Sequence, residues 1–267
     1  MSVPEDLLRY LERRGAGRAV AVRAGEAGHR AVGEALARLH LASRGYPLPG
    51  RSPRLRFGRL VQGWVDVLRE ARAFGETLRA SPPESAWPLF EETYAYYHQL
   101  AQAALYYLLD HGYESLSVEL RRYGVLAHQM LAPPLVAWED GRIVFLAPDT
   151  WRFDVPTRDV AHYARHVLAE EGPESALAFL RGYAEVRPFV PEEGPFVYGV
   201  FLLPYEWIEA YKKYREGNVR EAEARLAARV HRETEWANAV RKFREAWAAF
   251  GLDVAPIPWF EGARTVG

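Results

Sequence analysis

The chain has 267 residues, 49% of them hydrophobic and 26% charged, which is enough to bury one large core or two small ones. The net charge of −1 argues against a nucleic-acid-binding protein, since such proteins carry a basic excess. There is no cysteine and no run of about eighteen apolar residues. The sequence therefore predicts no disulfide, no thiolate metal site or nucleophile, and no membrane span.

The N-terminal stretch MSVPEDLLRYLERR is charged and amphipathic, and it lacks the apolar segment of a secretory signal. We therefore expect a cytoplasmic protein. Asparagine, glutamine, methionine and cysteine are all scarce, which is typical of heat-exposed proteins. The basic residues are nearly all arginines, which is also typical of a GC-rich genome, and we expect a thermophilic source.

Helical periodicity dominates the first half of the chain. Apolar residues recur at helical spacing in five segments: Glu5–Arg14, His29–Ser43, Leu60–Arg79, Trp87–His111 and Glu114–Arg122. The alternating stretch Arg18–Ala24 predicts a short strand, and GYPLPGRSP predicts a loop. The basic cluster Arg51–Arg59, RSPRLRFGR, suits phosphate contacts, but we favour a solvated loop with carboxylate partners nearby.

The clearest β signal lies in the middle of the chain. LVAW (Leu135–Trp138) and RIVFLA (Arg142–Ala147) flank EDG, which predicts a hairpin with a glycine turn. The pattern then becomes helical again in five segments: Arg158–Glu170, Pro173–Val186, Pro191–Leu203, Tyr205–Glu216 and Val219–Phe250. Two prolines in the last stretch predict an extended tail. The predicted fold class is α+β, mostly helical, around one small hairpin.

This order of segments resembles the C-terminal lobe of the aminoglycoside-phosphotransferase-like kinases, and within them the spore-coat CotS type. The resemblance covers roughly Glu34 to Trp247. It rests on ALARLHLASRGY, VLAHQMLAPPLVAWEDGRIVFLAPD, WRFDVPTRDVAHYARHVL and YAEVRPFVPEE, in this order. It implies a protein-kinase-like fold with a vestigial N-terminal segment (1–33), a helical C-lobe (34–250) and an extended tail (251–267).

The resemblance also implies which residues occupy the catalytic positions. Phosphotransfer in this fold depends on a few charged groups arranged around Mg-ATP. Carried over position by position, the catalytic aspartate falls on Met130, the metal-binding asparagine on Leu135 and the metal-binding aspartate on Ala147. None of these side chains offers the oxygen that Mg²⁺ prefers. The resemblance therefore implies a degenerate active site.

The flanking positions of the motif are retained. The loop histidine falls on His128, which we interpret as a structural histidine rather than a general base. Asp154 and Asp159 suit a cap and a brace better than an acid–base pair, because the family residue matching Asp159 braces the loop and Asp159 begins a helix. Asp149 is the alternative metal ligand, although we favour a turn residue there.

The features with which the family binds its nucleotide are also missing from the sequence. No lysine precedes Lys212, and no glycines follow the G-x-G-x-x-G spacing. About thirty residues before Glu34 are too few for a five-stranded sheet, since strands average about five to six residues. ATP and Mg²⁺ belong to the family, but the sequence predicts neither cofactor here.

Two side-chain patterns on the helices have alternative interpretations. His162 and His166 are four residues apart, as in a metal pair, but no glutamate follows His162, and we expect them at the surface or at an interface. An aromatic stripe at helical spacing is expected in the core, or in part on a partner-binding surface. It consists of Tyr94, Tyr97, Tyr106 and Tyr107.

The sequence predicts a pseudokinase, a catalytically inactive kinase-like protein that acts as an interaction or scaffold module. Its expected partner is another protein, with a homo-oligomer as a further option and no nucleic acid. Two alternatives stay open. One is a phosphotransferase for aminoglycoside-, choline- or sugar-like acceptors with a displaced site on Asp149, Asp154 and His128. The other is a non-catalytic small-molecule binder that uses the cleft in which the related kinases bind their acceptor.

Overall fold

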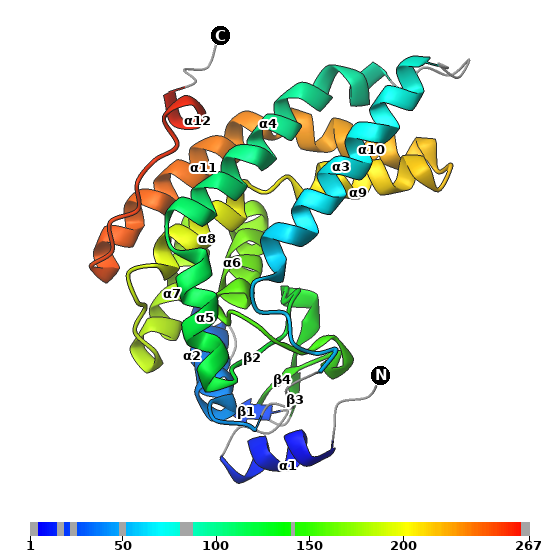
Figure 1. Cartoon of the computed structure of the whole chain (residues 1–267). Helices are drawn as coiled ribbons and strands as arrows, with labels where there is room; N and C mark the ends of the chain where they lie inside the picture. The colour runs from blue at the N-terminus through cyan, green and yellow to red at the C-terminus, as the bar shows by residue number, and fades with distance from the viewer. Residues whose placement is uncertain are drawn as a thin grey trace.

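A computed structural model describes residues 5–14, 19–21, 26–47, 52–80, 88–139 and 142–262. Figure 1 shows a helical body with the small sheets and α1 (Glu5–Arg13) at one end. Two long helices, α3 (Arg59–Ala80) and α4 (Pro88–Asp110), run from the middle of the body to the opposite end. The mostly helical α+β fold expected from the sequence is confirmed.

The other helices follow the predicted segments closely. They are α2 (Glu26–Ser43), α5 (Tyr113–Tyr123), α6 (Thr157–Glu171), α7 (Pro173–Val186), α8 (Glu193–Leu202), α9 (Tyr205–Arg215), α10 (Val219–His231), α11 (Glu233–Glu245) and α12 (Pro258–Gly262). Three 3-10 turns accompany them: η1 (Pro133–Leu135), η2 (Pro148–Thr150) and η3 (Ala246–Phe250). Within the described part of the chain, no helix combines the length and the apolar character needed to cross a bilayer.

Two small antiparallel sheets flank the loop that begins at His128. The first has the strand order β1 (Ala19–Ala21), β4 (Arg142–Phe145), β3 (Val136–Glu139), and it contains the predicted hairpin. β1 confirms part of the strand expected at Arg18–Ala24, whose other residues lie outside the described chain. The second sheet pairs β2 (Leu126–Ala127) with β5 (Arg152–Phe153) and was not predicted.

Helices α2 and α7 pack backbone against backbone through two glycines. A Cβ atom at Gly33 would lie 2.1 Å from the carbonyl oxygen of Phe179, and one at Gly182 would lie 1.9 Å from that of Arg30. Neither position has room for a methyl group. This close contact allows His40 on α2 to meet the hydroxyl of Tyr183 on α7 at 2.8 Å.

The prediction of a single helix over 219–250 is wrong. The segment divides into α10, α11 and η3, and Arg232 lies between the first two with φ −94° and ψ 4°. No glycine or proline marks this break. Arg232 instead donates a hydrogen bond to the carbonyl oxygen of Ala169 on α6, a tertiary contact that sequence periodicity does not reveal.

The prediction of an extended tail is also partly wrong, because α12 is helical. The preceding residues 252–257 are irregular and packed on the body. The hydroxyl of Tyr107 donates to the carbonyl of Ala255 at 2.8 Å, and the backbone nitrogen of Ile257 donates to the hydroxyl of Tyr198 at 3.2 Å. Phe260 is buried as well, so this end of the described chain belongs to the core.

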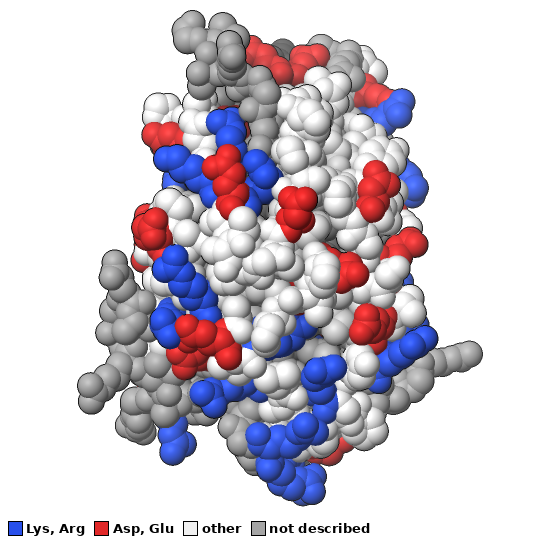
Figure 2. All heavy atoms as spheres, turned by 90° about the vertical axis from the view of Figure 1, so that its left-hand side faces the viewer, with Lys and Arg blue, Asp and Glu red and all other residues white. Residues whose placement is uncertain are grey.

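Charged side chains of both signs are mixed over the face shown in Figure 2, with basic residues gathered at its lower end. In Figure 1 that end holds α1 and the lower part of α5. Exposed arginines occupy the last turns of both helices, namely Arg13 on α1 and Arg121 and Arg122 on α5. There they offset the partial negative charge of the helix C-termini.

Candidate functional site

The loop after β2 begins with a buried histidine. The Nε2 atom of His128 lies 2.8 Å from the carbonyl oxygen of Leu146. A carbonyl only accepts, so Nε2 carries a proton and donates this hydrogen bond. Nδ1 is buried without a hydrogen-bond partner among the described residues. The ring is therefore directed into the hairpin rather than toward solvent, as expected of a structural histidine.

Asp159, in the first turn of α6, holds this loop from inside the protein. Its Oδ1 atom accepts a hydrogen bond from the backbone nitrogen of Gln129 at 2.7 Å, and its Oδ2 atom accepts one from the backbone nitrogen of His128. Oδ2 also lies 3.2 Å from Nε2 of His40. The side chain is fully buried. These are the contacts of a residue that braces the loop.

The protonation states within this cluster follow from its contacts. Burial pushes the pKa of Asp159 upward, but the contacts with His40 and His128, led by the hydrogen bond to His40, together outweigh burial and lower the pKa. Burial lowers the pKa of His40, although Asp159 opposes that effect. A neutral His40 then donates from Nε2 to an ionised Asp159 and accepts the hydroxyl proton of Tyr183 at Nδ1.

Asp154 also forms hydrogen bonds with this loop. Its Oδ1 atom accepts from the backbone nitrogen of Val155 at 2.9 Å. Its Oδ2 atom accepts from Nε2 of Gln129 at 3.0 Å and from Nη1 of Arg158 at 3.1 Å. Burial raises the pKa of Asp154, and the charge of Arg158 opposes that rise. Asp154 and Asp159 thus converge on Gln129, whose φ of 84° is left-handed, and not on each other.

The three positions that the resemblance predicts to be degenerate lie around this loop. Met130 is exposed, with 66% of its surface accessible. Leu135 ends η1, and its carbonyl oxygen accepts the backbone N–H of Leu146 at 2.9 Å, which extends the hairpin. Ala147 is exposed and precedes η2 with a left-handed backbone, φ 49° and ψ 54°. None of these side chains carries an oxygen donor.

The remaining acidic candidate, Asp149, does not replace the missing donors. It lies in η2 and is exposed, and its backbone carbonyl accepts from Nη1 of Arg152 at 2.6 Å. Nowhere in the described chain do three or more histidine, aspartate or glutamate side chains gather closely enough to hold a metal ion. The donor set around the loop therefore does not fit the Mg²⁺ that the family would require.

The arginine-rich segment before α3 differs from expectation. Arg54 is buried and donates to the carbonyl of Trp151 at 2.7 Å. Arg56 and Arg59 are exposed and form no ion pair with any described residue. For both of them, the expected carboxylate partners are therefore not found among the described residues, and Arg51 itself lies outside those residues.

The two histidines on α6 differ in exposure. His166 is exposed, as expected. His162 is half-buried, with its ring edge-to-face against Tyr205 at 5.1 Å and its Nε2 atom buried without a partner among the described residues, so it lies only partly at the surface. The two side chains therefore do not present a metal pair. In the aromatic stripe, Tyr97 and Tyr107 are buried as expected.

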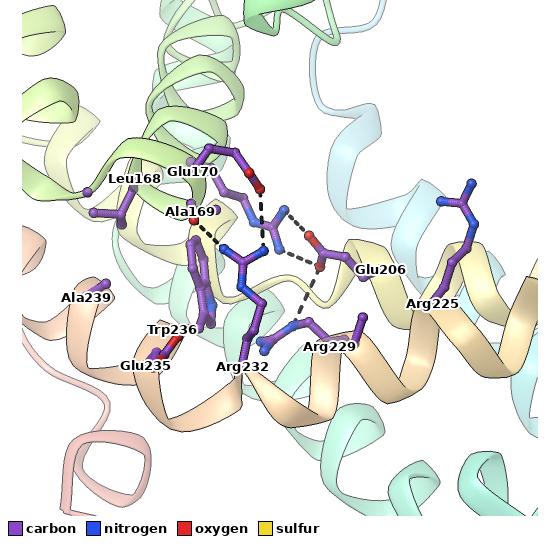
Figure 3. Close-up of a pocket in the computed structure, with 13 residues that line it drawn as sticks. Leu168, Ala169, Glu170, Glu206, Arg225, Arg229, Arg232, Glu235, Trp236 and Ala239 are labelled. Atoms are coloured by element: carbon purple, nitrogen blue, oxygen red, sulfur yellow. Dashed lines mark hydrogen bonds and ion pairs between the residues drawn. The ribbon is translucent and has the colours of Figure 1, made fainter.

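A cavity of about 430 Å³ lies where α6, α9, α10 and α11 meet (Figure 3). No residue singled out in the sequence lines it. Arg225, Arg229, Arg232 and Trp236 do so, at spacings of four, three and four residues along α10 and α11. In the continuous helix that the sequence predicts over 219–250, that spacing would place them on one face, and it is the sequence signal that indicates a shared lining.

Comparison with known proteins gives a consistent relationship. A family model described as Spore coat putative kinase YutH matches residues 19–243. The chain is 25% identical over 187 residues to the endospore coat-associated protein YutH of Bacillus subtilis (strain 168). That alignment covers 68% of this chain and 54% of the relative, so the chain spans about half of the relative's length.

A solved structure supports the fold. The crystal structure of an aminoglycoside phosphotransferase from Alicyclobacillus acidocaldarius subsp. acidocaldarius DSM 446 matches with a TM-score of 0.64. The match covers 90% of this chain and 82% of that one, at 15% sequence identity. At this identity the similarity establishes a kinase-like fold and nothing about activity.

Proposed function

The chain belongs to the family of spore coat putative kinases of the YutH type, and from this membership we propose that it is a kinase-like protein that transfers no phosphate and acts by binding another protein. The observation that carries the proposal is the loss of three oxygen donors at one site. The family resemblance places Met130, Leu135 and Ala147 at the positions of the catalytic aspartate and the two metal ligands.

The physical consequence of these replacements is the loss of charge neutralisation. Catalysis in this fold consists largely of positioning Mg-ATP and neutralising the phosphate charge. Mg²⁺ requires oxygen ligands in near-octahedral geometry, and the thioether of Met130 and the alkyl groups of Leu135 and Ala147 supply none. The position of Met130 also lacks a group that accepts the proton of an acceptor hydroxyl.

The alternative phosphotransferase with a displaced site finds less support in the geometry. His128 and Asp154 are each only 1% exposed, and their hydrogen bonds hold the hairpin and Gln129. Asp149 is exposed, but one carboxylate is a poor site for a metal–nucleotide complex. The contacts of Asp159 and Asp154 preserve the shape of the loop without its reactive groups, as a binding module requires.

A thermal-shift titration with Mg-ATP and Mg-GTP tests the catalytic half of the proposal. A ligand that binds the folded state raises the melting temperature in a saturable manner. We expect no such rise and no phosphate transfer to aminoglycoside, choline or sugar acceptors. A saturable rise, or a transfer activity that Asp149→Asn abolishes, would contradict the proposal.

The binding half needs a separate measurement. The tagged chain is used to capture partners from extracts of its host, and each candidate is then purified alone and mixed with the chain. We expect a defined complex that elutes as one species in size-exclusion chromatography. If every purified candidate elutes separately from the chain at micromolar concentration, the interaction role is wrong.

A further inference from the structure

The cavity between α6, α9, α10 and α11 owes its volume to small side chains. Ala169, Gly172, Ala228 and Ala239 line it, together with the larger Leu168 and Trp236. Where helices diverge, alanine and glycine leave unfilled space that longer side chains would occupy. Its volume of about 430 Å³ falls within the range of roughly 300–1,000 Å³ typical of small-molecule sites.

This cavity is separate from the degenerate kinase-like site. Asp159, which braces the loop, is in the first turn of α6, whereas the cavity is lined by Arg165 and by residues 168–170 farther along the same helix. With a rise of about 1.5 Å per residue, Arg165 is about 9 Å and Glu170 about 16 Å along the axis from Asp159. No residue of the loop or hairpin lines the cavity.

One wall of the cavity is a fixed ionic framework. Nη1 and Nη2 of Arg165 donate to the two carboxylate oxygens of Glu206 at 2.8 and 2.7 Å. Arg229 lies 3.7 Å from Glu206 and 2.6 Å from Glu233. The guanidinium of Arg165 also lies 4.9 Å from the ring of Trp236. These contacts occupy Glu206 with two cations and hold both guanidinium groups in place.

The ion pair of Arg232 is much more exposed, and its Nη2 atom also donates to the carbonyl oxygen of Ala169. The side chain of Arg232 is 48% exposed and lies 3.4 Å from Glu170, which is itself 57% exposed. Figure 3 shows Arg232 reaching across the cavity from the end of α10 toward Glu170 and Ala169 on α6. Exposed ion pairs contribute little to stability, so another anion can replace Glu170 at small cost. The planar guanidinium is suited to a carboxylate, which it binds through two parallel hydrogen bonds.

We propose that this cavity binds a small amphipathic carboxylic acid, with its apolar body on Trp236 and Leu168 and its carboxylate on Arg232. An ammonium group in the same place would face the guanidinium groups of Arg165, Arg229 and Arg232. The remaining acidic residue of the lining, Glu235, is exposed to solvent. The charge arrangement therefore selects an anionic head group. This site does not depend on the proposed loss of phosphotransfer.

Octanoate, octylammonium and 1-octanol are matched probes for this site, because they share the chain length and differ in head-group charge. Isothermal titration calorimetry is performed on the full chain at concentrations well below those at which the probes aggregate. We expect saturable 1:1 binding of octanoate at least about tenfold tighter than that of 1-octanol, and no binding of octylammonium. Arg232→Gln should weaken octanoate binding at least tenfold, while Arg220→Gln, an exposed change on α10 outside the cavity, should not.

A second variant separates binding from folding, because Arg232 also lies at the break between α10 and α11. Ala228→Trp fills the cavity from α10 and leaves Arg232 intact, and circular dichroism verifies that it folds. We expect this variant to lose octanoate binding as well. The proposal is overturned if octanoate does not bind, if octylammonium binds equally well, or if octanoate binding survives both substitutions.

Discussion

The Oδ1 atom of Asp159 lies 2.7 Å from the backbone nitrogen of Gln129, the residue immediately before Met130. A buried, ionised carboxylate thus fixes the backbone next to Met130, where the resemblance to the kinases places the catalytic aspartate. The loop keeps this brace although Met130 has no charge to position. The shape of the loop and its chemistry are therefore separable, since different residues determine them.

Asp159→Asn should lower the free energy of unfolding by about 2–4 kcal/mol. The amide keeps one acceptor oxygen but turns its NH₂ group toward backbone N–H donors, and hydrogen bonds to a charged group contribute about 1.5–3 kcal/mol. Urea unfolding measures the change. The matched control is Asp149→Asn on the exposed η2 turn, which should stay within about 0.5 kcal/mol of the wild type. Equal effects of the two substitutions would contradict the bracing role.

Ala147 should tolerate asparagine better than a β-branched residue. Its backbone is left-handed, with φ 49° and ψ 54°, a conformation that costs most L-residues roughly 1–2 kcal/mol but suits asparagine. Ala147→Asn should therefore raise the free energy of unfolding by up to about 1 kcal/mol, and Ala147→Val should lower it by at least about 1 kcal/mol. Thermal denaturation followed by circular dichroism ranks the variants. A valine variant as stable as the asparagine variant would show that residue 147 is not left-handed.

The sequence predicted the regular elements well and the site only in part. Apolar residues at helical spacing predicted the positions of the helices, and two strand-like stretches around a glycine turn predicted the hairpin. Both signals depend only on residues that are close together in the sequence. The break at Arg232 escaped prediction because a contact with Ala169 on another helix marks it, and no glycine or proline does. The β2–β5 pair has two residues per strand, too few for an alternation signal.

The site was predictable where it depends on a motif and unpredictable where it depends on packing. The resemblance identified Met130 and Asp159, but not the role of Gln129, whose side chain and backbone bind both buried aspartates. Nor did the sequence reveal that His162 is half-buried, which depends on Tyr205 of another helix. The cavity was missed because its small lining residues come from separate segments of the chain.

Gly182→Ala should be strongly destabilising. The added methyl group would lie 1.9 Å from the carbonyl oxygen of Arg30, so α2 and α7 would have to separate. We expect a loss of at least about 2 kcal/mol, as for other overpacking changes in a tight core. Gly63→Ala on α3, where nothing lies within 4 Å of the new Cβ atom, should instead add about 0.4–1 kcal/mol. Guanidinium unfolding of both variants provides the comparison, and a neutral Gly182→Ala would refute the backbone contact.

His162 should make the protein less stable as the pH falls below neutrality. Burial lowers the pKa of His162 to about 3, with Arg158 and Arg165 adding to the effect and Asp159 opposing it. In the unfolded chain the pKa is about 6.5, so between these two values the unfolded state binds more protons than the folded state. The contribution to stability is complete above pH 6.5 and is lost as the pH falls toward 3, at up to about 1.4 kcal/mol per pH unit.

His162→Gln removes this titration and should flatten the dependence of stability on pH. Between pH 6.5 and 5, the wild type should lose about 1.6 kcal/mol more than the variant, because the unfolded wild type gains a proton at residue 162 that the variant cannot bind. His40, whose pKa burial also lowers, is present in both proteins, so its effect cancels in the difference. His166→Gln, at an exposed position four residues farther along α6, should give a curve parallel to the wild type. Urea unfolding at each pH measures all three proteins. If the wild-type and His162→Gln curves are parallel, His162 is protonated in the folded protein as readily as in the unfolded chain, and the buried, unpartnered placement of its Nε2 atom is wrong.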